Sequence, residues 1–217
     1  MYKVFYCDIR NISDAEFSQE LAKLPPLRRR YILSKKNIDD RKRSLAASVL
    51  IARAVKNFTG QTKEPVIAYG QYQKPYCTNY KVHFNASHSG NYTAVAVSDS
   101  EIGIDIESLR EYSPAVAKKY FTEGEIEYIS AAKQRQQRDR RFFELWTAKE
   151  AYLKMTGEGT DSSFCRSIWT PELCKTVAPY DKVYIVPDGY LHQYSLEYVF
   201  PEKECLVSFS NSYNLNT

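Results

Sequence analysis

The sequence predicts an α+β fold of two pseudo-symmetric halves, each a long helix packed on a small, mainly antiparallel sheet. Two long helical segments favour this fold, over 41–58 and 143–154, because their apolar residues recur every three or four positions. Each ends near a Thr-Gly pair and is followed by short strand-like segments. The 217 residues suffice for two domains of about 100 residues each. We divide the chain into subdomains 1–108 and 109–217, with the active site at their interface.

The composition is that of a globular protein and argues against several other classes. Apolar residues make up 43% of the chain and charged residues 26%, and the net charge is a mild +4. No apolar run is long enough to span a bilayer, and the first residues resemble a strand rather than a signal region. The five cysteines are scattered without C-x-x-C spacing, which argues against a disulfide framework or a zinc site. We therefore expect a cytoplasmic, reduced protein with no role at a membrane.

The expected elements of the first half follow from periodicity and from end signals. The proline pair Pro25-Pro26 and acidic or serine N-caps separate the helices, and glycine and asparagine mark the turns. The expected helices are 14–24, a basic helical stretch to residue 36, and 41–58 capped by Asp39-Asp40 and ended by Gly60; the expected strands are 2–9, 65–68, a strand–turn–strand unit over 82–98 with its turn at 85–91, and 103–107.

The second half is expected to begin with helices and to end with strands. Helices are predicted from residue 114 to 120, from residue 122 onward, over the charge-rich stretch 133–141 and over 143–154. Strands are predicted at 184–187, 194–200 and 204–209, the last two joined as an antiparallel hairpin.

Three carboxylates form a candidate metal site. In Gly103-Ile104-Asp105-Ile106-Glu107, alternation places both carboxylates on one face of a strand, where they repel each other and call for a positive partner. Glu150, on the later helix, could supply a third oxygen ligand. Taken alone, Glu150 and Lys154 are a solvated i, i+4 ion pair, the commoner role of such spacing.

Basic and polar residues nearby suit a phosphate ligand. Eight lysines and arginines fall between residues 28 and 43, either as a phosphate-binding cluster or as a solvated helix face. Arg43 and Ser44 are expected in the first turn of their helix, where N–H groups favour anions. Ser87 and His88, in the expected turn, offer further donors. Together with the carboxylates, these residues predict a Mg²⁺–pyrophosphate site.

Three motifs in order resemble those of the Sfp-type 4′-phosphopantetheinyl transferases. They are Asn85-Ala86-Ser87-His88-Ser89-Gly90, Gly103-Ile104-Asp105-Ile106-Glu107 and Trp146-Thr147-Ala148-Lys149-Glu150-Ala151-Tyr152-Leu153-Lys154. The resemblance covers the chain roughly from Arg28 to Lys154. It implies Mg²⁺-dependent transfer of the 4′-phosphopantetheine arm of coenzyme A to a serine of an apo carrier protein, with release of 3′,5′-ADP.

The resemblance also implies a role for each matching residue. Asp105, Glu107 and Glu150 would hold Mg²⁺, or Mn²⁺, and Glu150 would take the proton of the carrier serine directly or through water. Lys154 would steady the pyrophosphate or protonate the leaving phosphate. The residues implied in coenzyme A binding are Arg28, Arg43, Ser44, Lys74, Ser87, His88, Lys149 and Lys154. Tyr31 stands where some relatives carry a lysine, so which arginine of 28–30 meets the 3′-phosphate stays open.

The partner is expected to be an acidic acyl or peptidyl carrier protein, met by a monomeric enzyme that binds no nucleic acid. Docking is expected near 112–130, where Tyr120 and Phe121 are either apolar anchors or core residues. Two other functions are weighed. A coenzyme A- or carrier-binding module without catalysis would not need all three carboxylates and Lys154. A nucleic-acid-binding protein would be expected to carry a higher net charge and a stacking motif.

Overall fold

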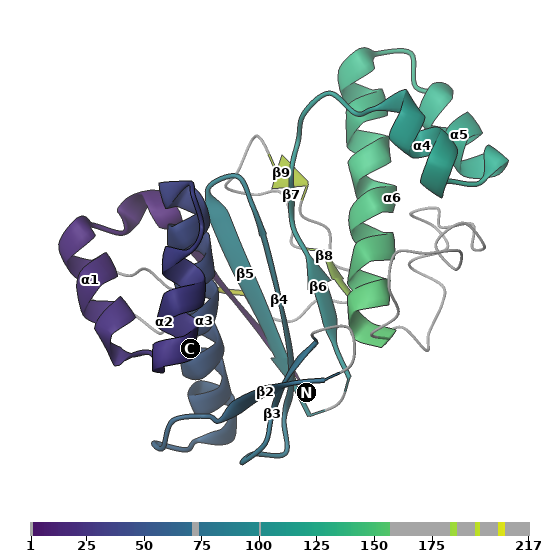
Figure 1. Ribbon diagram of the computed structural model, residues 1–217. Helices are drawn as coiled ribbons and strands as arrows, with labels where there is room; N and C mark the ends of the chain where they lie inside the picture. Colours follow the sequence, from purple (N-terminus) through teal and green to yellow (C-terminus); the bar gives the residue numbers. More distant parts are fainter. Residues whose placement is uncertain are drawn as a thin grey trace.

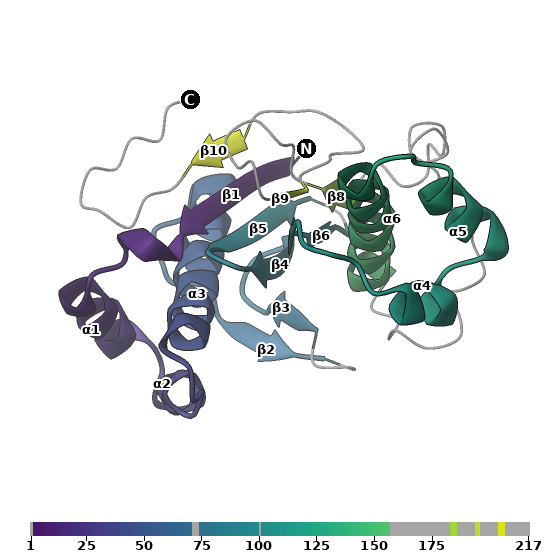
Figure 2. The same ribbon diagram turned by 90° about the horizontal axis from the view of Figure 1, so that it is seen from above.

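The strands of the molecule lie between two long helices. A computed structural model describes residues 2–70, 74–99 and 101–156, together with the backbone of β8 (Val183–Ile185), β9 (Tyr194–Ser195) and β10 (Glu204–Leu206). Helix α3 (Ile38–Thr59) lies on one side of the strands and α6 (Arg135–Thr156) on the other (Figures 1 and 2). The expected α+β class is confirmed.

The main sheet has the order β10-β1-β5-β4. Strand β5 (Tyr92–Ser98) pairs antiparallel with β1 (Tyr2–Asp8) and with β4 (His83–Ser89). The alternating side chains of this sheet enter two cores. Phe5 and Val95 pack against α3, whereas Val4 and Ala94 pack against the isoleucines of residues 102–106. The segment that carries the predicted carboxylates therefore packs through its isoleucines on the face of the sheet opposite to α3.

The helices of the first half show how local signals set their ends. Helix α1 (Asp14–Lys23) begins with a capping box between Ser13 and Glu16 and is followed by α2 (Pro26–Leu33). Helix α3 is capped by Asn37, whose side chain accepts from the Asp39 backbone N–H, and it ends at Gly60 with φ 69°. The expected start at residue 41 is thus wrong, because Asn37 provides the N-cap ahead of the two aspartates.

Two short strands complete the first half. Strand β2 (Ile67–Tyr69) pairs antiparallel with β3 (Pro75–Cys77), so the strand expected over 65–68 begins two residues later and has a partner strand that was not predicted. A 3₁₀ turn, η1 (Ile9–Asn11), links β1 to the first helix. The described helices include none that is both long and apolar enough to cross a membrane.

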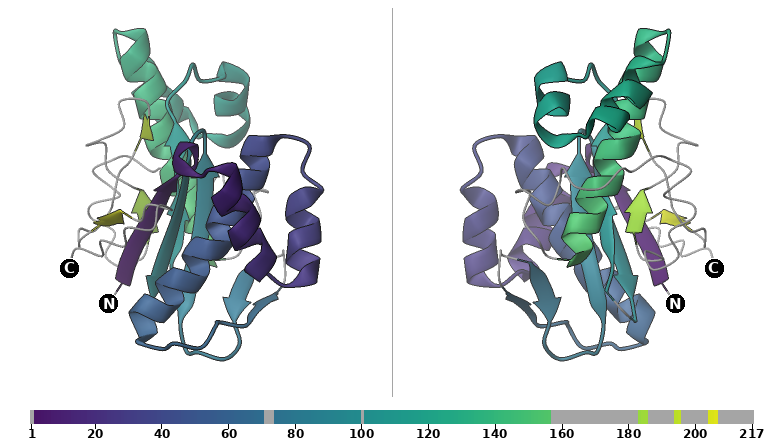
Figure 3. Two further views of the ribbon diagram at one scale, coloured as in Figure 1. Left: turned by 90° about the vertical axis from the view of Figure 1, so that its left-hand side faces the viewer. Right: turned by 90° about the vertical axis from the view of Figure 1, so that its right-hand side faces the viewer.

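The second half builds a helical cluster beside the strands. Helices α4 (Pro114–Tyr120) and α5 (Glu123–Ser130) lie beside the N-terminal half of α6 (Figure 3, right). Strand β6 (Gly103–Asp105) pairs with β8, and β7 (Glu107–Ser108) pairs with β9. Of the predicted hairpin between the last two strands, the structure describes only β9, which joins β7, and β10, which joins β1; the residues between them, 196–203, lie outside the described part of the chain. The division at residue 108 stays a prediction.

Candidate functional site

Strand β4 is joined to the carboxylate segment by its side chains. The Asn85 side chain accepts the Ile104 N–H at 3.3 Å, Ser87 Oγ accepts the Ile106 N–H at 3.3 Å, and Ser89 Oγ accepts the Ser108 N–H at 3.0 Å. We call this set, Asn85, Ser87 and Ser89 with residues 104–108, the seam. These hydrogen bonds recur at every second residue, as they do between two paired strands. On the side of β4, however, side-chain oxygens accept them in place of backbone carbonyl groups.

The seam corrects the expected turn over 85–91. Ser87, His88 and Ser89 lie on β4, and the turn is confined to Gly90, with φ 53°, and Asn91. The small polar residues imitate a turn sequence. They form a strand because their side-chain oxygens accept hydrogen bonds from the backbone N–H groups of residues 104–108.

Asp105 is the most constrained carboxylate of the site. It is 3% exposed, and its Oδ1 accepts from Ser87 Oγ at 2.7 Å and from Lys154 Nζ at 2.5 Å. Lys154 Nζ also donates to Ser87 Oγ at 2.9 Å. Burial raises the pKa of Asp105, and Lys154 and Ser87 act to lower it. The second oxygen, Oδ2, is buried and has no hydrogen-bond partner among the described residues.

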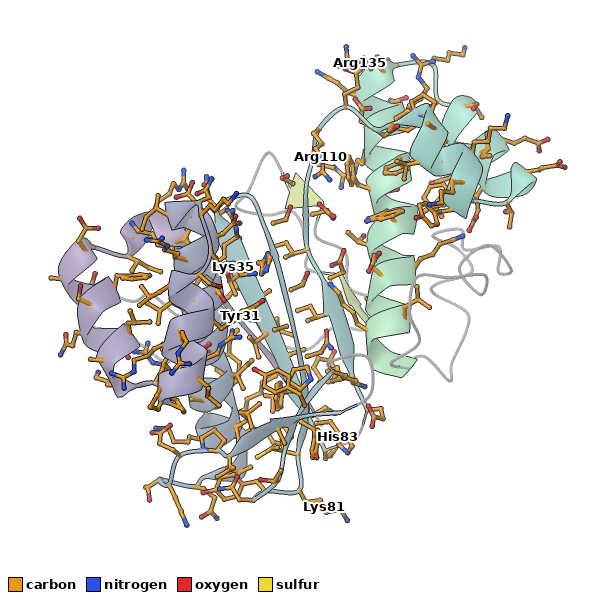
Figure 4. All side chains as sticks on the ribbon, in the orientation of Figure 1. Tyr31, Lys35, Lys81, His83, Arg110 and Arg135 are labelled. Atoms are coloured by element: carbon orange, nitrogen blue, oxygen red, sulfur yellow. The ribbon has the colours of Figure 1, made fainter. Side chains whose placement is uncertain are left out.

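Glu107 is held in a similar way by residues of both halves. Its Oε2 accepts from Ser89 Oγ at 3.0 Å and from Arg110 Nη1 at 2.9 Å. The Arg110 guanidinium lies 4.8 Å from the centre of the Phe143 ring on α6, and Figure 4 shows this side chain between the segment after β7 and α6. Arg110 is not among the predicted site residues, since an arginine three residues after a glutamate outside a helix carries no recognisable signal.

The pKa of Glu150 depends on the other two carboxylates. Burial raises the pKa of Glu150, Lys154 acts to lower it, and the negative charges of Asp105 and Glu107 raise it further. Across residues 2–70, 74–99 and 101–156, no three His, Cys, Asp or Glu side chains lie close enough together to hold a metal ion. The predicted ligand set of Asp105, Glu107 and Glu150 therefore stays a prediction.

His88 lies in a positive environment. Burial lowers the pKa of His88, and the charges of Arg43 and Lys154 lower it further. Arg43 donates to the Gly90 carbonyl oxygen and, at 2.7 Å, to Asp40 Oδ1. Since α3 begins at Ile38, Arg43 and Ser44 lie beyond its first turn, so their expected place in that turn is wrong, while their role in binding a phosphate stays a prediction.

Arg28 and Ser44 are brought together as a polar cluster between α2 and α3. Arg28 Nη2 donates to Ser44 Oγ at 3.4 Å, and Arg28 Nε donates to Ser48 Oγ at 2.8 Å. Tyr31 lies beside them, with the Arg28 guanidinium 4.9 Å and Lys35 Nζ 4.4 Å from its ring centre; Figure 4 labels Tyr31 and Lys35 on this side of the molecule.

Lys74 and Lys149 occupy ion pairs outside this cluster. Lys74 Nζ lies 2.8 Å from Glu101 Oε2, so its part in ligand binding stays a prediction. Lys149 Nζ lies 2.7 Å from Glu125 Oε2, and the two side chains are 2% and 0% exposed. Lys149 therefore points into the α5–α6 packing, and its expected phosphate contact stays a prediction. Phe121, 5% exposed, lies in the same core and is not an exposed anchor.

Comparison with known proteins gives matches over most of the chain. Residues 11–100 match the family model of the 4′-phosphopantetheinyl transferase N-terminal domain, and residues 101–200 match that of the 4′-phosphopantetheinyl transferase superfamily. The chain is 30% identical to "4′-phosphopantetheinyl transferase psf-1" of Bacillus pumilus, over 72% of this chain and 70% of the relative.

Two further relatives differ in how much of their length is matched. "4′-phosphopantetheinyl transferase gsp" of Aneurinibacillus migulanus is 35% identical over 57% of this chain, and the match spans only about half, 52%, of that relative. "4′-phosphopantetheinyl transferase Sfp" of Bacillus subtilis strain 168 is 28% identical over 92% of this chain and 94% of the relative.

Proposed function

We propose a transferase function for this chain, which belongs to the 4′-phosphopantetheinyl transferase superfamily. It transfers the 4′-phosphopantetheine moiety of coenzyme A to a serine of an apo carrier protein and releases 3′,5′-ADP. One observation carries the proposal. Ser87 of β4, Asp105 of β6 and Lys154 of α6 meet through hydrogen bonds of 2.5 to 2.9 Å, so the three motifs converge at one point.

The residues present fit a divalent cation. The buried Asp105 Oδ2 has no hydrogen-bond partner in the described part of the chain, and carboxylate oxygens are the donors that Mg²⁺ prefers. Asp105, Glu107 and Glu150 would hold Mg²⁺, or Mn²⁺, as a requirement of the reaction. When bound, such an ion supplies charge neutralisation at the pyrophosphate.

The chain's own groups account for the proton and the leaving group. The carrier serine oxygen forms a new bond to the β-phosphorus of coenzyme A, and the bond from that phosphorus to the bridging oxygen breaks. Glu150 accepts the serine proton, directly or through water. Lys154 faces the developing negative charge on the leaving 3′,5′-ADP and stabilises it.

Positive and polar groups on the other side of the seam would bind coenzyme A. Ser87 accepts a hydrogen bond from Lys154, and the charges of Arg43 and Lys154 both act on His88; Ser87, His88 and Arg43 would meet phosphate oxygens. Arg28 and Ser44 form a second polar cluster suited to the 3′-phosphate, because a guanidinium binds phosphate in a bidentate manner. Lys74 is also proposed to bind coenzyme A, because its place in the sequence resembles that of a lysine of the transferase family.

The partner is proposed to be an acidic acyl or peptidyl carrier protein. The chain has a net charge of +4, and complementary charge accelerates the encounter of two proteins. We also propose that the enzyme acts as a monomer in the cytoplasm; Cys7 and Cys77 are free thiols, as suits a reducing compartment.

Intact-mass spectrometry of apo carrier proteins tests the function. The carriers are incubated with the chain, coenzyme A and Mg²⁺, with EDTA as the control. A gain of one phosphopantetheine that EDTA abolishes is expected, and Asp105→Asn should remove it. This variant should still fold, because the asparagine side chain keeps an oxygen that can accept from Ser87 and Lys154 in place of Oδ1. Binding of coenzyme A without transfer to any carrier would support the non-catalytic module instead.

A further inference from the structure

The two carboxylates of the seam are held by the same arrangement. In each, one oxygen accepts both a serine hydroxyl from β4 and a cation from the second half of the chain. Ser87 and Lys154 share Oδ1 of Asp105. Ser89 and Arg110 share Oε2 of Glu107. The same arrangement of a serine hydroxyl and a cation on one carboxylate oxygen therefore occurs twice, at positions two residues apart along both segments.

The serine hydroxyls are themselves fixed by the backbone. Ser89 Oγ accepts the Ser108 N–H at 3.0 Å while it donates to Glu107, and Ser87 Oγ accepts the Ile106 N–H at 3.3 Å while it donates to Asp105. A hydroxyl has only one hydrogen to donate. The Ser89 hydroxyl also has Ser108 Oγ as an acceptor at 3.4 Å, but the shorter contact of 3.0 Å and the negative charge favour the Glu107 carboxylate. Each serine thus sets the rotamer of the carboxylate opposite to it.

Arg110 restrains Glu107 from the other half. Its guanidinium bonds Glu107 Oε2 and the Ser108 carbonyl oxygen, the latter at 3.0 Å, and lies over the Phe143 ring of α6. Both described partners of the Glu107 carboxylate therefore bond Oε2, and Oε1 receives a hydrogen bond from neither of them.

We propose that Ser89 and Arg110 are positioning residues: they hold Oε2 of Glu107 so that Oε1 is presented to the divalent cation. This inference rests on the proposed function, in which Glu107 is a cation ligand. Outer residues that orient a ligand typically account for about 10- to 100-fold in metal affinity or activity. Neither residue needs to contact coenzyme A or the carrier for this effect.

Binding of Mn²⁺ provides a readout separate from turnover. Electron paramagnetic resonance measures free Mn²⁺ during titration of the chain in the presence of coenzyme A and without a carrier. Ser89→Ala and Arg110→Gln are each expected to weaken Mn²⁺ binding about tenfold or more. Ser89→Thr keeps a hydroxyl and should restore most of the affinity. The same substitutions should raise the Mg²⁺ concentration for half-maximal transfer and leave the KM for coenzyme A unchanged.

Ser98→Ala is the matched control. Ser98 is a buried strand serine of the same sheet, 1% exposed, whose hydroxyl donates to Asp99 and not to a seam carboxylate. Thermal unfolding of each variant checks the fold. Unchanged Mn²⁺ affinity in a folded Ser89→Ala chain would overturn the proposal, as would equal weakening by Ser98→Ala. Failure of the wild type to transfer would overturn the proposed function, whereas the Mn²⁺ titration would still report on Ser89.

Discussion

Removing one member of the buried Lys149–Glu125 ion pair tests how the helix that carries Glu150 is anchored. Lys149 Nζ lies 2.7 Å from Glu125 Oε2, and both side chains are shielded from water. Glu125 Oε2 also accepts the Thr122 N–H at 2.8 Å, as part of the capping box of α5. Lys149→Met keeps the apolar stem beside the Phe121 ring and removes the charge.

The expected cost follows from burial. Taking away one partner of a buried pair leaves an uncompensated charge, which destabilises a protein by about 3–5 kcal/mol. For a chain of this length each kcal/mol lowers the Tm by about 2–4 °C, so a fall on the order of 10 °C is expected. The double variant Lys149→Met/Glu125→Gln should recover most of this loss, because glutamine is neutral and still serves a capping box.

Urea unfolding followed by circular dichroism measures these differences. The matched control is Lys23→Met, which removes a lysine 2.9 Å from Glu20 at the surface of α1. An exposed pair of this kind contributes about 0.2–1 kcal/mol. A Lys149→Met chain as stable as the Lys23→Met chain would refute the reasoning, as would a double variant no more stable than the single one.

Activity of the double variant separates anchoring from chemistry. If Lys149 serves only the α5–α6 packing, the refolded double variant should transfer phosphopantetheine at close to the wild-type rate. A stable, well-folded double variant with no transfer would show that Lys149 acts on a phosphate, as its motif position implies, and that its buried pair with Glu125 is not its functional state.

Three further predictions follow from single residues. Burial and the neighbouring Asp8 raise the pKa of Cys7 to about 12, so iodoacetamide at pH 8 should label Cys77 in the native chain and Cys7 only after unfolding, as peptide mass mapping would show; equal labelling would contradict this. Gly60→Ala should cost about 1–2 kcal/mol in urea unfolding, because φ is 69° and nothing lies within 4 Å of the added Cβ, so backbone strain alone is paid. The lowered pKa of His88 leaves this side chain neutral near pH 7, and a bound phosphate would raise that pKa. Binding of coenzyme A should therefore take up a proton and weaken as the pH rises. Calorimetry in two buffers measures this proton uptake, which should be absent in His88→Gln.

The positions of most helices and strands could be predicted, because short-range signals determine them. Ser13 with Glu16 marks the start of α1, and Gly60 marks the end of α3. The start of α3 was missed, since Asn37 and the following aspartates are all good N-caps and only the structure shows which side chain bonds a free N–H. Local sequence does not rank such neighbours.

The seam was missed for a different reason. Ser87 and Ser89 carry the composition of a turn, and a turn was predicted there. Their hydrogen bonds to the carboxylate segment join residues 18 or 19 positions apart, at Asp105, Ile106 and beyond, so the preference for a strand comes from tertiary contacts. The motif before Gly90 therefore serves the fold and the site together: without its hydroxyls, strand β4 would face the N–H groups of the carboxylate segment with no acceptor for them.

The orientation of Lys149 follows from helix geometry alone. Successive residues of a helix are about 100° apart around its axis, so Glu150 and Lys154, four residues apart, differ by only about 40°. Lys149 lies about 100° from Glu150 and about 140° from Lys154, and cannot share their face. Because Lys154 bonds Asp105 and Lys149 bonds Glu125, the two lysines of one motif act on opposite sides of α6. One lysine faces the site, and the other fixes the helix from which it projects.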